Sequence, residues 1–127
     1  MIVNIPISIG ELIDKITILE IKSTHINDQE KKKTIQNELS LLNDIYKHLT
    51  HSPALDQAVS HLKKINQELW NIEDEIRECE REKDFGETFI RLARSVYVTN
   101  DQRANIKKTI NHLTGSTLEE VKSYEEY

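Results

Sequence analysis

The sequence of 127 residues contains only three glycines, two prolines and one cysteine. So few glycines and prolines leave few positions for the tight turns that join β-strands, and long helices with short connections are favoured instead. The glycines stand at positions 10, 86 and 115, which is too far apart for a phosphate-binding loop. A single cysteine excludes an internal disulfide and a cysteine-rich zinc site.

Metal-binding and membrane-spanning signatures are missing as well. The five histidines are scattered, with no His-x-x-x-His or Cys-x-x-Cys spacing, so the sequence predicts no metal site and identifies no cofactor. Residues 1–7 are apolar, but they have no basic lead and Pro6 interrupts them. We therefore expect no signal peptide, no membrane partner and a cytoplasmic location.

The charge is acidic and unevenly distributed. A net charge of −5 argues against nucleic acid as a partner, because phosphate backbones attract basic proteins. Residues 56–87 carry ten acids and five bases, whereas residues 88–115 carry five bases and one acid. Either these segments neutralise each other, or the bases form a cationic pocket for a small anionic ligand.

Helical periodicity is what the sequence does have. Between residues 55 and 83, apolar side chains recur every three or four residues, at Leu62, Ile65, Leu69, Ile72, Ile76 and Cys79. Such a stripe is typical of a helix that faces a core, and it predicts that Cys79 is a buried thiol. Trp70, the only tryptophan, lies beside the stripe and one helical turn before Glu73.

Other segments show similar patterns. The expected helices span residues 11–26, 28–50, 55–83, 88–98 and 99–113, with a short turn of helix at 116–119. Ser8 with Glu11, and Thr99 with Gln102, have the spacing of capping boxes that begin helices. Gly86 is placed to end the 55–83 helix in a left-handed conformation.

These elements predict an all-α fold. We expect one helical-bundle domain over residues 1–127, built on a long antiparallel helical hairpin of residues 28–83, with a short extended N-terminal segment. The apolar seams at 35–49 and 62–79 can extend across subunits, so a homo-oligomer is expected.

A group of polar residues is the candidate ligand-binding site. Glu20 lies in an arc of isoleucines, where a carboxylate must be paired or protonated. Basic and amide side chains crowd the expected helix junction at 94–107, where backbone amides can also bind an anion. The candidate residues are Glu20, Trp70, Glu73, Asp74, Arg94, Tyr97, Asn100, Asp101, Arg103 and Lys107. The structural alternative is that Glu20, Glu73 and Asp74 accept hydrogen bonds from 94–107 in one buried network.

Two pairs of acids stand one helical turn apart, as a metal ion on a helical scaffold requires. They are Glu11 with Asp14, and Glu75 with Glu78. The pairs resemble those of the all-α NTP pyrophosphohydrolases (MazG-like enzymes), although here their order is reversed and they are far apart in the sequence. That resemblance implies a metal-dependent pyrophosphohydrolase-like activity as one alternative.

Several blocks of the sequence resemble a bacterial family of unknown function. They are Gly10–Lys22, Leu69–Asp74, Asp84–Gly86, Ala93–Tyr97, Thr99–Ala104 and Lys122–Tyr124. The resemblance covers nearly the whole chain and implies no activity, but it places most of the candidate site residues in the family pattern. Because the apolar seams can extend across subunits, we expect a small helical interaction or assembly module. The alternative is a binder of, or an enzyme acting on, a small anionic metabolite or nucleotide.

Overall fold

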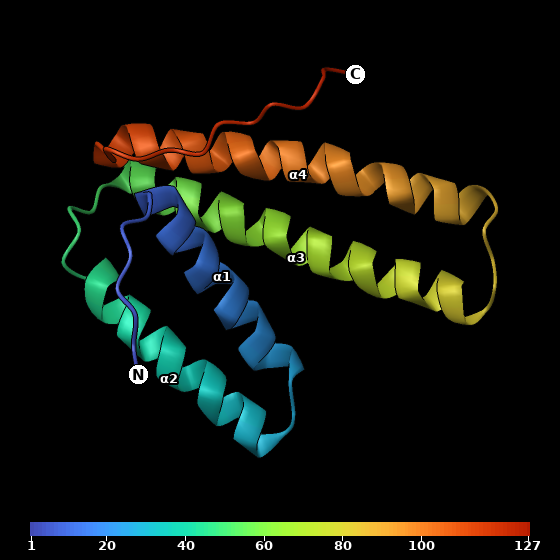
Figure 1. Ribbon diagram of the computed structural model, residues 1–127, viewed down its shortest axis with the longest axis horizontal. Helices are drawn as coiled ribbons and strands as arrows, with labels where there is room; N and C mark the ends of the chain where they lie inside the picture. The colour runs from blue at the N-terminus through green and yellow to red at the C-terminus, as the bar shows by residue number, and fades with distance from the viewer.

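The computed structural model describes residues 1–127 and contains four helices and no strand (Figure 1). The helices are α1 (Ile9–His25), α2 (Gln29–Tyr46), α3 (Pro53–Arg81) and α4 (Glu87–Thr114). The prediction of an all-α helical bundle is confirmed. None of the four helices combines the length and the apolar composition that a bilayer crossing requires.

Side-chain caps set where the first three helices begin. The Ser8 hydroxyl accepts a hydrogen bond from the Glu11 amide at the start of α1, as predicted. Asp28 caps α2, and Ser52 caps α3 immediately before Pro53. A proline there costs nothing, since the first helical amide has no partner within the helix.

The long antiparallel hairpin consists of α3 and α4, which lie side by side in Figure 1. The sequence placed it at residues 28–83, in what are now α2 and α3, and that assignment is wrong. Instead, α2 packs on α1 and has no close backbone contact with α3. The apolar seam of α2, with Ile35 and Leu39, is buried against α1.

Helix α4 is continuous through the predicted break at Thr99–Gln102. Thr99 is only 7% exposed and lies inside the helix, so its capping-box spacing is coincidental. The expected turn of helix at 116–119 is also absent, because Gly115, with φ of 66°, ends α4 and the tail then runs back along the helix (Figure 1). The left-handed residue after α3 is Lys83, whereas Gly86 caps α4.

Two apolar clusters meet on α1. In the first, Ile13 of α1 packs against Leu62 of α3 and Ile110 of α4. The second cluster joins α1 to α2 and contains Ile16 of α1 with Ile35 of α2. A first helix covered on more than one face is what the sequence predicted.

The first cluster lies at one end of the hairpin. The α3 residues of the core cluster extend from Leu55 to Ile65, and its α4 residues are Ile106 and Ile110. We call residues 53–67 and 100–114 the proximal half of the hairpin, and residues 68–99 the distal half, which contains the tip.

Candidate functional site

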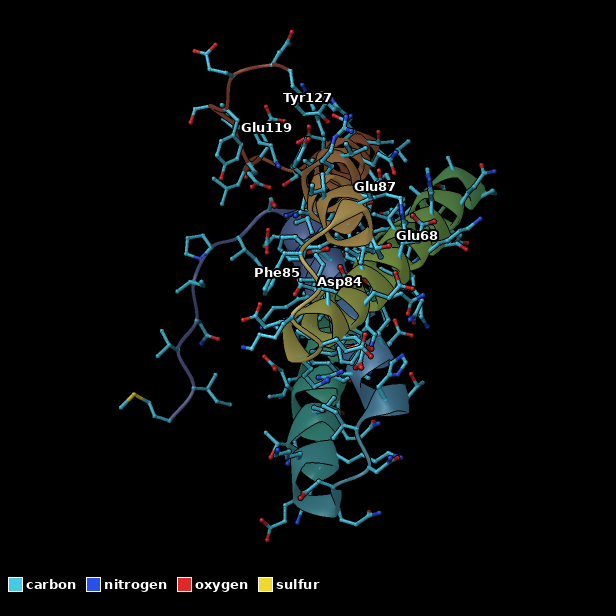
Figure 2. The ribbon with its side chains drawn as sticks, turned by 90° about the vertical axis from the view of Figure 1, so that its right-hand side faces the viewer. Glu68, Asp84, Phe85, Glu87, Glu119 and Tyr127 are labelled. Carbon is cyan, nitrogen blue, oxygen red and sulfur yellow. The ribbon has the colours of Figure 1, made fainter.

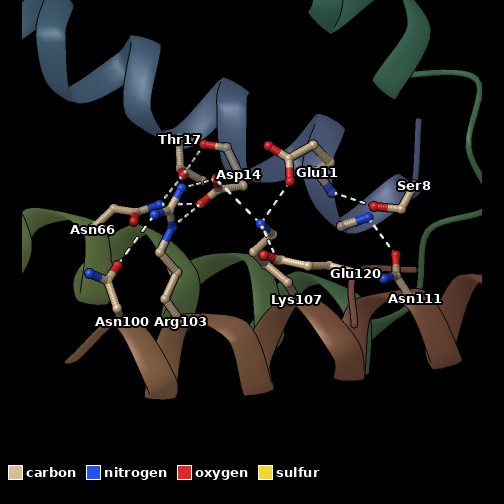
Figure 3. Close-up of polar contacts among 11 residues, drawn as sticks. Ser8, Glu11, Asp14, Thr17, Asn66, Asn100, Arg103, Lys107, Asn111 and Glu120 are labelled. Atoms are coloured by element: carbon tan, nitrogen blue, oxygen red, sulfur yellow. Dashed lines mark hydrogen bonds and ion pairs between the residues drawn. The ribbon is translucent and has the colours of Figure 1, made fainter. Parts of the chain in front are cut away.

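A buried polar network fastens α1 to the proximal half of the hairpin (Figure 3). Its centre is Asp14 on α1, which is 1% exposed, with Thr17 one turn later and fully buried. The Thr17 hydroxyl donates to the backbone carbonyl of Asp14 at 2.8 Å. That hydrogen bond does not involve the Asp14 carboxylate, which accepts hydrogen bonds from the other helices.

Arg103 of α4 and Asn66 of α3 supply those hydrogen bonds. The Arg103 guanidinium binds both oxygens of Asp14, with a distance of 2.9 Å from Nε to Oδ1. The Asn66 side-chain nitrogen donates to Asp14 Oδ1 at 2.9 Å and to the Thr17 hydroxyl at 2.8 Å. The hydrogen bond from Arg103 to Asp14 is the main cause of a raised Arg103 pKa, so the guanidinium keeps its charge.

Lys107 forms the second part of the network. Its side chain is 9% exposed, and its ammonium group donates to Glu11 at 2.7 Å and to Glu120 of the C-terminal tail at 3.1 Å. Asp14 lies 4.0 Å away. Burial alone would lower the pKa of Lys107, but the hydrogen bonds and the nearby carboxylates together raise it. The lysine is therefore charged, and the carboxylates of Glu11 and Glu120 balance its charge.

Gly10 allows α1 to approach α4 closely next to Lys107. Its amide donates to the Asn111 side-chain oxygen at 2.7 Å. A Cβ at this position would lie 2.7 Å from the Lys107 backbone oxygen, closer than atoms in proteins pack. A glycine is thus required for the two backbones to meet here.

A cavity of about 520 Å³ opens beside Arg103, within the size range of small-molecule sites. Its walls combine apolar side chains with charged ones. The lining residues are Ile18, Ile21, Asn66, Leu69, Trp70, Glu73, Asp74, Arg77 and Arg103. His25 stacks on the Trp70 indole, with ring centroids 4.7 Å apart, and so fixes the ring at the edge of the cavity.

The structure brings four of the ten predicted ligand-binding residues together at this cavity: Trp70, Glu73, Asp74 and Arg103. Asn100 lies next to Arg103, with 3.5 Å between Arg103 Nη1 and Asn100 Oδ1. Lys107 belongs to the buried network.

The other predicted residues lie elsewhere. The C-terminal tail covers Tyr97 and Asp101, since Tyr127 packs edge-on against Tyr97 and Lys122 pairs with Asp101 at 3.6 Å. The Asp101 hydrogen bond raises the pKa of Tyr127. Arg94 is exposed on α4, away from the cavity.

The predicted partners in the buried network are wrong. Glu20 is half-exposed and pairs with Lys63 at 3.1 Å, while Glu73 pairs with Arg77 on its own helix at 3.5 Å. Asp14 accepts the hydrogen bonds that were assigned to them, because α4 covers the flank of α1 opposite to the α2 contact. Thr17, Asn66 and Asn111 were not proposed as network residues. The signal available for Asp14 was its place in the Glu11/Asp14 pair, which was interpreted as a metal ligand pattern.

The two acid pairs do not meet. Glu11 and Asp14 bind Lys107 and Arg103, whereas Glu78 pairs with Arg81 near the hairpin tip. No three His, Cys, Asp or Glu side chains are grouped so that they could hold a metal ion. An anionic ligand at Arg103 or Lys107 would have to displace a carboxylate of the protein, and such a site stays a prediction.

The fold and site define an all-α protein whose first helix is fastened to a long hairpin by buried ion pairs, beside a partly apolar cavity. Residues 3–127 match the model of a family described as "Family of unknown function (DUF6165)", and the chain belongs to that family. No curated protein and no solved structure matches the chain. The expected membership in a family of unknown function is confirmed.

Proposed function

We propose that the protein is a small helical assembly module, and that a second copy of the same chain covers the distal half of its hairpin. One observation carries the proposal: the hairpin continues far beyond the residues that α1 and α2 cover (Figure 1). The apolar stripe of α3 continues there through Ile72 and Ile76, which are only partly buried. A two-helix segment leaves part of its apolar face without a partner.

The apolar side chains of the distal half support this proposal. Phe85 is 49% exposed and Ile90 54%. Phe89 and Ala93 follow at helical spacing on the same side of α4 and are partly buried. Figure 2 looks along the hairpin from its tip, with Asp84, Phe85 and Glu87 at the near end and α1 and α2 behind them. Large apolar side chains that stay exposed close together in the sequence are typical of an interaction site.

Charge complementarity selects a second copy as the partner. Residues 68–84 of the hairpin carry eight acids and three bases, whereas residues 87–98 carry Arg91 and Arg94 against Glu87 alone. A two-fold axis across the distal face would place α3 of each copy beside α4 of the other. That arrangement would bring opposite charges together twice, once for each copy.

A single domain and a cytoplasmic location complete the proposal. The domain is supported by α1, which packs on each of the other three helices. The location is supported by Cys79, a free thiol in a chain without disulfides, as is usual in reducing compartments.

The test is light scattering over about a tenfold range of protein concentration. We expect a mass at least twice the 14.8 kDa of one chain. Ile90→Glu should shift the mass toward the monomer, because it would bury a charge in the interface.

Ile45→Glu is the matched control, since Ile45 is also 54% exposed but lies on α2. It should leave the mass unchanged. A mass of 14.8 kDa at every concentration would contradict the proposal, and dissociation by Ile45→Glu alone would place the contact on α2 instead.

A further inference from the structure

We infer that the cavity beside Trp70 binds a primary ammonium group carried on an apolar body, so that its ligand is an organic amine. The cavity is lined from both halves of the hairpin, so its α3 residues lie at the border of the contact between copies proposed above. Asn66, which is 5% exposed, lines the cavity together with apolar and charged side chains.

The orientation of the Asn66 amide is fixed by its neighbours. The Asp14 carboxylate can only accept hydrogen bonds, and the Thr17 hydroxyl already donates its proton to the Asp14 backbone. Both groups therefore require a donor from Asn66, and its nitrogen faces them at 2.9 and 2.8 Å. The Asn66 carbonyl oxygen must point the other way.

That oxygen accepts no hydrogen bond from the protein, although Asn66 is only 5% exposed. No fully buried side-chain polar atom lacks a partner in this structure, so the oxygen is reached from the cavity that Asn66 lines. An acceptor that is reached only from the cavity binds either a water molecule or a donor group of a ligand. Its complement is an N–H group of a ligand.

The charges around the cavity favour a cation. Arg103 is neutralised by Asp14, and Arg77 pairs with Glu73 at 3.5 Å. Asp74 also lines the cavity and has no ion-pair partner in the protein. One carboxylate is thus left over, which attracts an ammonium group and repels an anion.

The walls determine the rest of the ligand. Ile18, Ile21, Leu69 and Trp70 supply the apolar lining. A volume of about 520 Å³ accommodates a small molecule. An ammonium group attached to an aryl or alkyl chain would satisfy Asn66 and Asp74 with its N–H groups and place its apolar part against Trp70.

The test compares two probes with the same aromatic body and opposite charge, 2-phenylethylamine and 3-phenylpropanoate, at neutral pH. Trp70 is the only tryptophan, so its indole N–H resonance reports on the cavity directly. We expect the amine to shift this resonance in a saturable way and the carboxylate to leave it unchanged. Competition between the two for one site with equal affinity would overturn the inference, and so would the absence of any shift at about 10 mM amine.

Asp74→Asn removes the unpaired charge without changing the shape of an exposed side chain. It should weaken amine binding by about tenfold or more, as expected for a charge-assisted hydrogen bond. Glu75→Gln is the matched control, because Glu75 is the next residue on α3 but does not line the cavity. It should leave the amine affinity unchanged. Equal affinities in the wild type and Asp74→Asn would refute the role of the carboxylate. Both variants keep Asn66 and the buried network intact, so they are expected to fold.

Discussion

The two halves of the α3–α4 hairpin are built from the same helices but are stabilised differently. In the proximal half, Leu62 and Ile110 are fully buried between three helices. In the distal half the same α3 stripe continues to Cys79, which is buried, yet Ile72 and Ile76 are only partly buried. A periodic stripe therefore identifies the inner face of a helix, whereas the reach of the neighbouring helices decides how much of that face is covered.

The polar contacts of the two halves differ in the same way. Proximal ion pairs join residues far apart in the sequence, and the carboxylate of Asp14, which pairs with Arg103, is buried. Distal pairs join residues three or four positions apart on one exposed helix, as in Arg77 with Glu73. Exposed pairs of this kind contribute about 0.3–0.5 kcal/mol. The proximal network holds α1 on the hairpin, and the distal pairs connect no helices.

The largest effect is expected from breaking the proximal network. Asp14→Ala would leave Arg103 without its carboxylate partner and Lys107 with one fewer, in a site that is 1% exposed at Asp14. Removing one partner of a buried ion pair costs about 3–5 kcal/mol. Urea unfolding followed by circular dichroism measures this loss.

Glu73→Ala is the distal control for that experiment. It removes an exposed carboxylate with one ion-pair partner on its own helix, so the free energy of unfolding should change by about 0.5 kcal/mol or less. Similar losses from the two variants would show that the halves do not differ as described.

The next effect comes from two leucines on the same stripe of α3. Leu62→Ala should cost about 2–5 kcal/mol, because Leu62 is 0% exposed within the core cluster. Leu69→Ala is the same substitution two turns later, at a partly buried position beside the cavity, and should cost clearly less. Thermal and urea unfolding of both variants decide the comparison, and equal losses would mean that α1 covers the α3 stripe into the distal half as well.

The sequence predicted the helices well and their pairing poorly. The α3 stripe and the Ser8 cap depend on local spacing, which is visible in the sequence. The pairing of α2 with α1 was missed, because α2 and α3 carry similar seams and a short connection favours neighbours. The break predicted at Thr99 failed because a capping-box pattern cannot be distinguished from the same residues inside a helix.

The candidate site was predicted in part. Trp70, Glu73, Asp74 and Arg103 do line one cavity, because the first three share a helix surface. The role of Asp14 was not predicted, since it lies off the isoleucine stripe of α1 and is buried only where α4 crosses that flank. Glu20 was predicted to be buried because it lies in the isoleucine arc. No helix covers its side of α1 completely, so its carboxylate stays partly exposed.

The smallest effect concerns the response of the two halves to alkaline pH. Burial opposes the charged form of Lys107, but its carboxylate partners outweigh that effect and raise its folded-state pKa. A raised pKa means that the charged lysine stabilises the fold fully below its ordinary pKa of about 10.4, and that this stability is lost as pH rises through the folded pKa. Lys107→Arg keeps its charge over that range, so its stability should fall less steeply with pH than that of the wild type. Tyr46 and Tyr127 also have raised pKa values, but they titrate in both proteins and cancel in the comparison.

Lys83→Arg, at an exposed position near the tip, should retain the wild-type slope. Urea unfolding at a series of alkaline pH values measures these slopes, and identical slopes for Lys107→Arg and the wild type would show that Lys107 does not hold α1 on the hairpin through its charge.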